Sequence, residues 1–561
     1  MPLQKNQVLT LQVERLSSDG SGVAHSPEGE TVFIPGAAPG DEARVRIVKD
    51  CKRYAFGILD EVLTPSPDRI PVDCAVAGPC GGCSLRHLDY AAELRAKQEN
   101  VADSFARIGG LDVPVLPIVG SPEIDRYRNK VQFPVGTDKA GRPCIGFYAG
   151  RTHRIVPCPD CRLQPGVLNE IGNTLCAFFA EKGIHPYNEE TGKGLVRHIF
   201  LRRGAHSGQI MVCLVCTRAK LPSAEELCTR LKEAFPDIVT ILLNVNAKNT
   251  NVILGSETHT LYGQGYIEDT LCGVPVQLGP LSFYQVNTLA AEQLYGIATE
   301  YAQLTPDDLL LDLYCGMGTI GLSMADHCRE LVGVEIVPEA IESAKANAAR
   351  MGAAVSAKSR FFCADAGQAA AQLAAEGLHP DVVMLDPPRK GCDEATLSAV
   401  VRMAPRRVVY VSCNPATAAR DAAWLEQNGY HAEKVQPVDL FPRTKHVETV
   451  VLLSHKKADS YIHIDVEFGE GEGKIPVDSI AKRAEAYKPK EKVTYKMIKE
   501  YIEAKYGFKV HTAYIAEVKR NLGLPMYDAP NAVEELKQPR KHPTPEKVEA
   551  IKDALRYFAV I

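Results

Sequence analysis

A cysteine lies where a predicted strand meets a predicted helix. In VVYVSCNPAT, residues 408–417, the β-branched and aromatic start predicts a strand, and Pro415 suits the first turn of a helix. Cys413 lies between the two, at the edge where open α/β sheets bind ligands, and a helix N-terminus lowers the pKa of a thiol. Cys413 is a candidate nucleophile, and a small buried residue in a turn is the alternative.

A glycine-rich loop follows another predicted strand. In LLLDLYCGMGTIGLSMA, Gly316 and Gly318 have the spacing that lets a backbone approach a nucleotide-like ligand at a helix N-terminus. Acidic residues end three further predicted strands: Glu335, suited to ribose hydroxyls, Asp365, where an adenine edge would lie, and Asp386. A nicotinamide site has no use for the Asp-Pro-Pro sequence at Asp386, so the set favours S-adenosylmethionine as the ligand.

A thiolate beside a methyl donor has a specific use. Carbon 5 of a pyrimidine is a weak nucleophile, and addition of a thiolate to carbon 6 makes carbon 5 enolate-like. A base must then remove the proton from carbon 5 so that the thiolate can leave. Glu448, in RTKHVETVVLL at the start of the last predicted strand, is the candidate base, and His446 is a weaker candidate.

A second group of cysteines lies far from Cys413 in the sequence. CAVAGPCGGCSLRHL places Cys74, Cys80 and Cys83 in a glycine-rich loop, a spacing that can wrap a metal or a cluster if a fourth ligand exists. HRIVPCPDCRLQ offers Cys158 and Cys161 as that ligand. Zinc is the main alternative to iron–sulfur, because sequence separates the two poorly, and free thiols are a further alternative.

The composition bounds the class of protein. The length of 561 residues predicts about three or four domains, and 45% hydrophobic with 24% charged residues is typical of a soluble globular chain. No apolar run has the length of a membrane span and the N-terminus has no signal core, so we expect a cytoplasmic protein. The net charge of -5 gives no global basic field, so any nucleic acid must be held by local patches.

Changes in pattern along the chain predict four segments. Residues 1–62 alternate apolar and polar positions between turns and predict an OB-like β-barrel of about five strands. Residues 63–284 predict an α+β domain whose strands are interrupted by one helix near 222–235. Residues 285–455 alternate strands and helices, as in a Rossmann-like doubly wound α/β domain, and residues 456–561 predict a small helical extension.

Several basic side chains are candidates for holding RNA, from which a uracil must be swung out to reach a thiolate. Arg126, Arg128 and Lys130 alternate along a predicted strand and so would share one face. Arg197 and Arg202 lie in another predicted strand. The candidates on the barrel are Arg44, Arg46, Lys49, Lys52, Arg53 and Tyr54.

Five motifs together resemble the RNA 5-methyluridine (uracil-5) methyltransferases. FYQVN, DLYCGMGTIGL, LDPPRKG, VSCNPAT and HVETVVLL have that family's order and spacing over about 285–454. The resemblance implies Cys413 as the nucleophile and Glu448 as the base. The residues that it implies for the cofactor and uracil pocket are Gln285, Tyr314, Glu335 and Asp386. Thr319 stands where some members have asparagine, so that contact is not carried over.

The resemblance extends to the N-terminal half. Residues 4–62 are similar to the TRAM barrel, and members acting on 23S ribosomal RNA follow it with a Cys-x5-Cys-x2-Cys loop. In those members a distant cysteine in a Cys-x-(Ile/Leu)-Gln context completes a 4Fe–4S cluster, which implies Cys161 as fourth ligand and leaves Cys158 as the alternative. The tRNA-specific branch lacks both features.

The prediction is therefore a monomeric S-adenosylmethionine-dependent methyltransferase that modifies carbon 5 of uridine in large-subunit ribosomal RNA. Three alternatives remain at this point. The substrate could be tRNA, or the Asp-Pro-Pro sequence could serve methylation of an exocyclic amine, which needs no cysteine. A non-catalytic RNA-binding or ribosome-assembly factor built on a methyltransferase scaffold is the alternative of another class.

Overall fold

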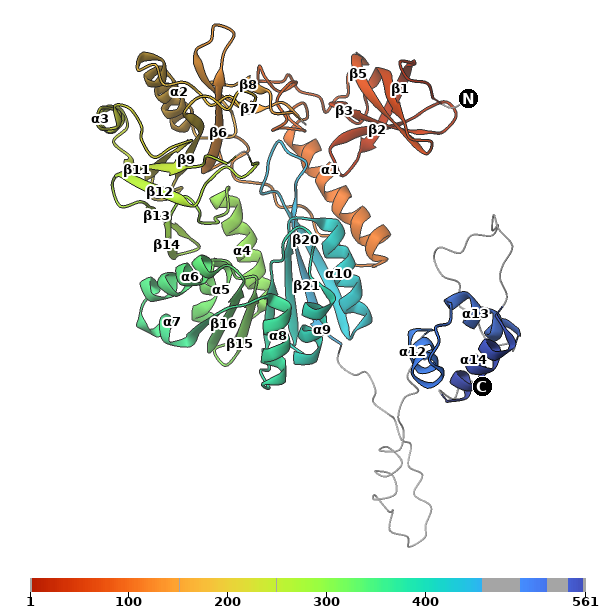
Figure 1. Ribbon diagram of the computed structural model, residues 1–561. Coiled ribbons are helices and arrows are strands. Elements are labelled where there is room, and N and C mark those ends of the chain that lie inside the picture. The colour runs from red at the N-terminus through yellow and green to blue at the C-terminus, as the bar shows by residue number, and fades with distance from the viewer. Residues whose placement is uncertain (1–2, 151, 249, 457–494, 522–542, 558–561) are drawn as a thin grey trace. The chain divides into compact units, whose positions relative to one another are not determined.

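The computed structural model describes residues 3–150, 152–248, 250–456, 495–521 and 543–557 (Figure 1). The chain divides into two compact units, Met1–Tyr461 and Ile462–Ile561, each of which has its own core. None of the described helices is long and apolar enough to cross a membrane.

The first strands form a closed barrel, which confirms the prediction of about five strands. Its strands are β1 (Val8–Leu16), β2 (Ser21–His25), β3 (Thr31–Pro35), β4 (Glu42–Asp50) and β5 (Tyr54–Thr64), closed in the order β1-β2-β3-β5-β4. Alternate residues such as Val45 and Ile47 fill the interior, as the period of two requires. Gly57 lets two strands approach, because a Cβ there would lie 2.3 Å from Val45.

A seven-stranded sheet forms the central region. Its order is β12-β11-β10-β9-β6-β7-β8. The strands are β6 (Lys130–Thr137), β7 (Pro143–Tyr148), β8 (Ile155–Pro157), β9 (Val196–Arg203), β10 (Ile210–Cys216), β11 (Ile238–Val245) and β12 (Glu257–Tyr262). Cys213 and Cys216 face different cores from opposite sides of β10, so they are no ligand pair.

Two predictions for this region are wrong. Besides the expected helix α3 (Ala224–Ala234), a second helix, α2 (Gly166–Glu181), packs on the sheet through Ile171 and Leu175. The predicted strand over 126–133 begins only at Lys130, because Arg126 has a left-handed φ of 59°. Arg126, Arg128 and Lys130 therefore do not form one strand face.

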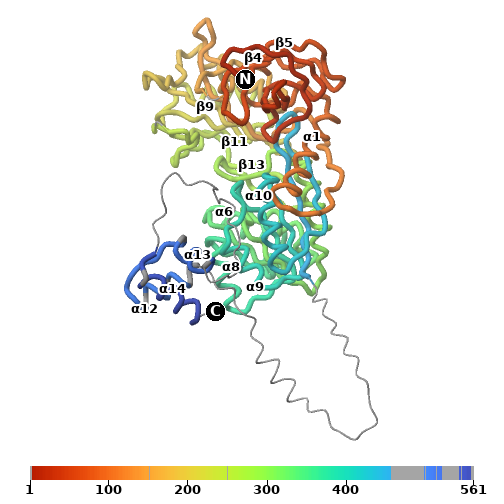
Figure 2. The backbone as a smooth tube through the Cα atoms, turned by 90° about the vertical axis from the view of Figure 1, so that its right-hand side faces the viewer, coloured from red at the N-terminus to blue at the C-terminus, as the bar shows by residue number. Residues whose placement is uncertain are grey.

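A long helix precedes the central sheet. Helix α1 (Tyr90–Asp103) begins at Asp89, whose carboxylate accepts a hydrogen bond from the backbone of Ala92 at 2.6 Å. It continues into a π-helical turn, η1 (Ser104–Gly109). Both lie beside α10 (Pro415–Gln427) in Figure 1 and Figure 2.

The α/β region contains a second seven-stranded sheet, in the order β17-β16-β15-β18-β19-β21-β20. The strands are β15 (Leu309–Leu313), β16 (Glu330–Glu335), β17 (Ser359–Cys363), β18 (Val382–Leu385), β19 (Arg407–Ser412), β20 (Tyr430–Val438) and β21 (Glu448–His455). The helices are α4 (Thr288–Ala302), α5 (Thr319–Ser323), η2 (Ala325–His327), α6 (Pro338–Met351), α7 (Ala353–Lys358), α8 (Ala366–Ala375), α9 (Glu394–Met403) and α10. A two-stranded hairpin, β13 (Ile267–Leu271) and β14 (Val274–Leu278), precedes them.

The direction of β21 decides which residues meet. Strands β15 to β19 are mutually parallel, and β21 pairs antiparallel to β19. The start of β21 therefore lies at the same edge as the carboxyl ends of the parallel strands. Helices cover both faces: Val409 and Val411 of β19 face one core, and Val408 and Tyr410 face the other.

The second unit is a small helical bundle in its described residues. Its helices are α12 (Tyr495–Tyr506), α13 (Thr512–Asn521) and α14 (Pro545–Tyr557). They pack around apolar side chains that include Ile498, Ile502, Ile515, Ile551 and Leu555.

Candidate active site

A cavity of about 1240 Å³ opens at the edge where these strand ends meet. Most of the residues predicted to act on cofactor or substrate line it: Gln285, Tyr314, Gly316, Glu335, Asp365, Asp386, Cys413 and Glu448. Gly318 does not line the cavity but belongs to the loop that does. It is the N-cap of α5 with a left-handed φ of 78°, and a Cβ there would lie 3.1 Å from the Cβ of Ala344. The strand-end residues therefore converge on one site.

Glu335 is fixed at one end of the cavity by backbone donors. Gly316 donates its N–H to one carboxylate oxygen of Glu335 at 3.1 Å. Ile336 and Val337 donate theirs to the other oxygen at 2.8 and 3.0 Å. The carboxylate is thus held beside the glycine loop, where its remaining lone pairs can accept hydrogen bonds from the two hydroxyls of a ribose.

Asp365 and Tyr314 complete this end. One oxygen of Asp365 accepts the N–H groups of Gly367 and Gln368, both at 3.1 Å, so Asp365 is a helix cap as well as a cavity residue. Tyr314 has a left-handed φ of 66°, and its hydroxyl lies 3.4 Å from that of Thr396. Tyr314 thus lines the cavity directly before the glycine loop, with its hydroxyl group beside α9.

The turn that carries Cys413 is closed by its neighbours. The hydroxyl of Ser412 accepts the N–H of Asn414 at 3.1 Å, and Asn414 caps α10 by accepting the N–H of Ala416 at 3.2 Å. The Asn414 amide also donates to the carbonyl of Arg389 at 3.0 Å. This last bond ties the cysteine turn to the Asp-Pro-Pro loop, so Cys413 and Asp386 share one wall of the cavity.

Strand register places Glu448 beside Cys413. Ser412 of β19 pairs with Thr449 of β21, and the Thr449 hydroxyl donates to the carbonyl of Ser412 at 3.2 Å. In an antiparallel pair the next positions along are Cys413 and Glu448. Glu448 is 6% exposed, so its carboxyl group reaches the cavity while being almost removed from water.

Burial and neighbouring negative charges raise the pKa values of the groups around Cys413. Burial, and then the Glu448 carboxylate, raise the pKa of the Cys413 thiol, while the Arg389 guanidinium opposes the rise. Burial raises the pKa of Glu448 to about 8, with Asp386 adding to the effect, and burial raises the pKa of Asp386 to about 7. The predicted lowering of the Cys413 pKa by the helix N-terminus is wrong, because burial and the carboxylates outweigh it.

Sequence reasoning missed two residues that complete the site. Arg389, which follows Asp-Pro-Pro directly, hydrogen-bonds the Cys413 thiol and stabilises its anion. Phe441 lines the cavity and packs edge-on against His446, with ring centroids 6.0 Å apart. Burial lowers the pKa of His446 to about 4, so this imidazole is neutral near pH 7. The arginine of LDPPRKG was the signal for Arg389; Phe441 had none, because its loop is irregular.

The second group of cysteines gathers from two segments. Burial raises the pKa of Cys80 and of Cys83, and the negative charge of a Cys161 thiolate raises both further. Cys161 therefore lies close to both of these thiols. Cys158 and Cys161 lie within hydrogen-bonding reach of each other, and this contact favours ionisation of one thiol of the pair by lowering its pKa. Among the described residues, no three His, Cys, Asp or Glu side chains are arranged to hold a single metal ion.

The structure separates the predicted RNA-binding residues into two classes. Arg197 and Arg202 are buried and donate to backbone carbonyls, of Lys248 at 2.6 Å and Ser282 at 2.7 Å, so the prediction that they contact RNA is wrong. Arg126 is bound to Asp160 at 2.7 Å. The barrel candidates are exposed: Arg44, Arg46, Lys49, Lys52, Arg53 and Tyr54. Of these, Arg44 and Arg46 of β4 form ion pairs with Glu61 and Asp60 of the neighbouring strand β5.

Known proteins share this sequence and architecture. Residues 276–456 match the family described as tRNA (Uracil-5-)-methyltransferase, and residues 2–59 match the TRAM domain. An uncharacterized RNA methyltransferase of Halalkalibacterium halodurans is 43% identical over 456 residues, which cover 81% of this chain and 98% of the relative. Another, from Clostridium tetani, is 41% identical over 455 residues, with the same coverage of 81% and 98%.

A solved structure extends the likeness to the cofactor. Pyrococcus abyssi tRNA (uracil-54, C5)-methyltransferase, in complex with S-adenosyl-L-homocysteine, has a TM-score of 0.63 and 27% identity. The match covers 80% of this chain and 100% of that one. The chain therefore belongs to the S-adenosylmethionine-dependent RNA uracil-5-methyltransferase family and carries a TRAM domain at its N-terminal end.

Proposed function

We propose that the protein, as a cytoplasmic monomer, methylates carbon 5 of a uridine in 23S ribosomal RNA through a covalent bond between Cys413 and the uracil. The observation that carries the chemistry is the register that sets Cys413 opposite Glu448. Both line a cavity whose other end holds Glu335 beside the glycine loop. Nucleophile, base and cofactor ligand thus share one chamber.

Each of these residues has its own step in the proposed reaction. The Cys413 thiolate, stabilised by Arg389, adds to carbon 6 of the uracil, and the electron pair of the ring double bond moves toward carbon 5 and oxygen 4. S-adenosylmethionine supplies the methyl group that carbon 5 takes up and leaves as the neutral thioether. Glu448 then removes the proton of carbon 5; the double bond re-forms and the thiolate is expelled. The neutral form of Asp386, favoured by its pKa of about 7, can donate to a uracil oxygen.

The choice of ribosomal RNA is supported by the N-terminal half. The barrel exposes Lys49, Lys52, Arg53 and Tyr54 close together, and the Tyr54 ring lies edge-on to Phe33 and Phe56. Aromatic rings with cations suit single-stranded RNA. The resemblance assigns a TRAM barrel followed by a cysteine loop to the ribosomal branch, although the tRNA enzyme of Pyrococcus abyssi also matches 80% of this chain and thus much of its N-terminal half. The tRNA alternative is favoured by the Pyrococcus abyssi structure, whose protein acts on uracil 54 of tRNA.

A competition between substrates tests the choice. Unmodified 23S ribosomal RNA and unmodified tRNA are offered with tritiated S-adenosylmethionine, and kcat/KM is compared. We expect ribosomal RNA to be preferred by at least about 100-fold, because discrimination at a site that reads hydrogen bonds and shape reaches this range. Replacing the modified uridine by cytidine provides the control and must abolish transfer. A preference for tRNA overturns the proposal while leaving the family unchanged.

We further infer that Cys74, Cys80, Cys83 and Cys161 hold a 4Fe–4S cluster with a structural role. The supporting observation is the donor set: thiols alone, gathered from two segments and close enough to shift one another's pKa, as an iron–sulfur site requires. Cys161 is assigned rather than Cys158 because CRLQ has the sequence context that the resemblance implies, and because the Cys161 thiolate is near enough to raise the pKa of both Cys80 and Cys83. The cluster would join residues 74–83 to residues 158–161.

Metal analysis separates these assignments. Protein purified without oxygen is expected to contain about four iron atoms per chain with equal acid-labile sulfide, and a broad visible absorbance. Cys161→Ala should lose both, whereas Cys158→Ala should keep them, because Cys158 is not one of the four proposed ligands. Iron retained in Cys161→Ala and lost in Cys158→Ala reverses the assignment, and stoichiometric zinc in place of iron rejects the cluster.

A further inference from the structure

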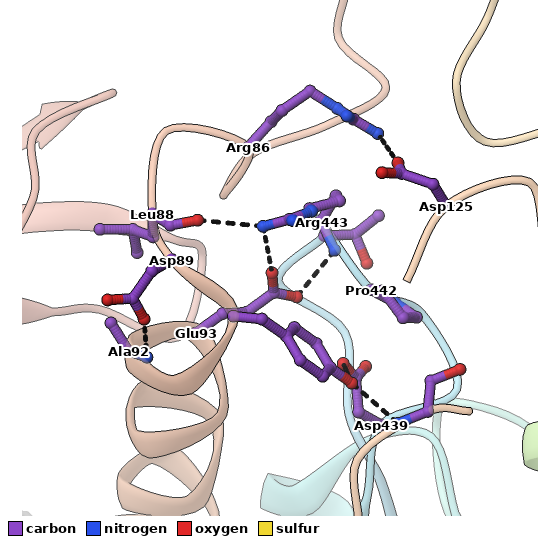
Figure 3. Close-up of polar contacts among 12 residues, drawn as sticks. Arg86, Leu88, Asp89, Ala92, Glu93, Asp125, Asp439, Pro442 and Arg443 are labelled. Atoms are coloured by element: carbon purple, nitrogen blue, oxygen red, sulfur yellow. Dashed lines mark hydrogen bonds and ion pairs between the residues drawn. The ribbon is translucent and has the colours of Figure 1, made fainter. Parts of the chain in front are cut away.

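The loop between β20 and β21 forms part of the cavity wall. Residues 439–447 connect the two strands, contribute Phe441 and His446 to the cavity, and lead directly into Glu448. The loop has one hydrogen-bonded turn of its own, closed by Thr444, which donates its N–H to the carbonyl of Phe441 at 3.1 Å, and it contains no helix or strand, so its position also depends on what packs against it. Figure 3 shows α1 in that place, with Glu93 pointing from the helix toward Arg443 of the loop.

Three charged side chains meet between α1 and the loop. Glu93 and Asp439 are fully buried and Lys97 is 2% exposed. The Lys97 ammonium lies 2.7 Å from a carboxylate oxygen of each acid and donates to the carbonyl of Phe441 at 3.2 Å. The Lys97 ammonium therefore donates to one residue of the helix, Glu93, and to two residues of the loop, Asp439 and Phe441.

The same acids hold the backbone of the loop. Glu93 accepts the N–H of Arg443 at 2.7 Å, and Asp439 accepts that of Phe441 at 3.0 Å. Arg443 has a left-handed φ of 67°, and its guanidinium donates to the carbonyl of Leu88 at 3.0 Å (Figure 3). Such a conformation in a residue other than glycine persists only where its surroundings impose it. The contacts from Glu93 of α1 and from Leu88, which precedes the helix, are those surroundings.

We call the buried polar contacts between α1 and loop 439–447 the clamp. Similar contacts continue from the loop toward the cysteine segment, residues 74–83. Leu85, two residues after Cys83, donates its N–H to the carbonyl of Arg443 at 3.1 Å. Next to it, buried Arg86 donates to Asp125 at 2.5 Å (Figure 3) and to Asp73 at 2.7 Å. The turn before α1, the helix itself and the loop are therefore joined by buried polar contacts, about 340 residues apart in the chain.

We propose that Glu93 and Lys97 are positioning residues for the active site: they hold loop 439–447 so that Phe441, His446 and Glu448 face the uracil. The inference rests on the proposed function for its chemical consequence. Without the Lys97 ammonium, buried Asp439 would lose its ion pair, and buried Glu93 would keep only the longer one to the Arg443 guanidinium, at 3.8 Å. The loop would then move to bring them to water. None of the three charged residues lines the cavity, and Glu335 is held there by the backbone of Gly316, so cofactor binding should be unaffected.

Lys97→Met in the full-length protein tests the proposal, because methionine keeps the length of the side chain and removes its charge. Arg95→Met is the matched control: Arg95 is a cation of the same helix whose ion pair with Asp68 is exposed. Three readouts are compared with wild type: hydrogen exchange of peptides covering 436–448 and 407–413, affinity for S-adenosylhomocysteine, and methyl transfer to RNA. Glu93→Gln serves as a second variant should Lys97→Met not fold.

We expect the exchange of loop peptides in Lys97→Met to rise at least about tenfold, with 407–413 and cofactor affinity unchanged. Methyl transfer should fall about 100-fold in kcat, the cost of a catalytic group misplaced by about 1 Å. Arg95→Met should match wild type throughout. Unchanged loop exchange overturns the proposal, and so does faster exchange with full activity. If wild type itself transfers no methyl group to RNA, the proposed function fails, whereas faster loop exchange still supports the clamp.

Discussion

Replacement of Cys413 by alanine is expected to abolish methyl transfer, with kcat lowered by at least about 10⁴-fold. Cys413 is the thiol at the cavity wall that is opposite Glu448 and hydrogen-bonded by Arg389. Without it carbon 5 of the uracil is not activated, and the remaining groups can only bind substrate and cofactor. Cofactor affinity should be retained, because Glu335 and the glycine loop lie at the other end of the cavity.

The measurement uses RNA that contains 5-fluorouridine. Fluorine at carbon 5 cannot leave as a proton does, so the reaction should stop at a covalent protein–RNA adduct that survives denaturation and is located by mass spectrometry. Wild type should give the adduct at Cys413, and Cys413→Ala should give none. Cys363→Ala is the matched control, because Cys363 is an exposed cysteine at the end of β17 that does not line the cavity. This control should react as wild type does.

The two other outcomes each select an alternative. Methyl transfer that persists in Cys413→Ala would reject the thiolate mechanism and favour methylation of an exocyclic amine, which needs no nucleophilic cysteine. Absence of both adduct and transfer in wild type, with RNA still bound, would favour a non-catalytic RNA-binding factor. The adduct therefore decides between reaction classes, and the sequence around the trapped uridine identifies the substrate.

The cofactor end could be predicted from sequence because its chemistry lies at the ends of regular strands. Parallel strands bring their carboxyl ends to one edge, so Gly316, Glu335 and Asp386 had to meet once the alternation of strands and helices was recognised. Glu448 could be placed with them only from its motif. Its position beside Cys413 depends on the antiparallel direction of β21, which no periodicity reveals.

The errors concern properties that depend on burial. Arg197 and Arg202 occur in a strand pattern that reads equally as a charged surface, yet buried backbone carbonyls bind both. The pKa of Cys413 was predicted from one helix end, whereas burial and Glu448 reverse the direction. Distant contacts decide such cases. The clamp on loop 439–447 is of the same kind, because Lys97 in an amphipathic helix reads as a solvated lysine until Asp439 is seen beside it.

Glu448→Gln is expected to stop the reaction after methyl transfer rather than before it. The glutamine amide cannot take the proton from carbon 5, so the methylated uracil should remain bound to Cys413, even on ordinary RNA. Turnover should fall by at least about 10³-fold, within the range attributed to a general base, while the first covalent step continues. Denaturing gels of the variant with unmodified RNA should show the persistent adduct.

His446→Gln is the comparison that identifies the base. His446 is neutral near pH 7 because burial lowers its pKa to about 4, so it could in principle accept a proton. It lies two residues before Glu448 and lines the same cavity. We expect no persistent adduct in His446→Gln. An adduct that accumulates in this variant and not in Glu448→Gln would exchange the two roles.

The pKa of Glu448 also predicts how stability depends on pH. Its pKa in the folded protein, about 8, lies above the ordinary 4.5, because burial and Asp386 favour the neutral acid. Folding therefore gains from the proton: this contribution is complete below about pH 4.5 and is lost as pH rises through about 8. In wild type the carboxylate must be kept buried at alkaline pH for the base to function, at a cost in stability.

Glu448→Gln should remove that cost. The amide resembles the neutral acid, so at pH 5 the variant and wild type should unfold with similar free energies. At pH 9 the variant should be more stable than wild type by up to about 5 kcal/mol, the value of a shift of roughly 3.5 pKa units at a nearly inaccessible group. Asp386 is present in both proteins, so its own titration largely cancels in the comparison. Urea unfolding at the two pH values measures the difference, and a wild type that is the more stable protein at pH 9 would show that Glu448 ionises without penalty.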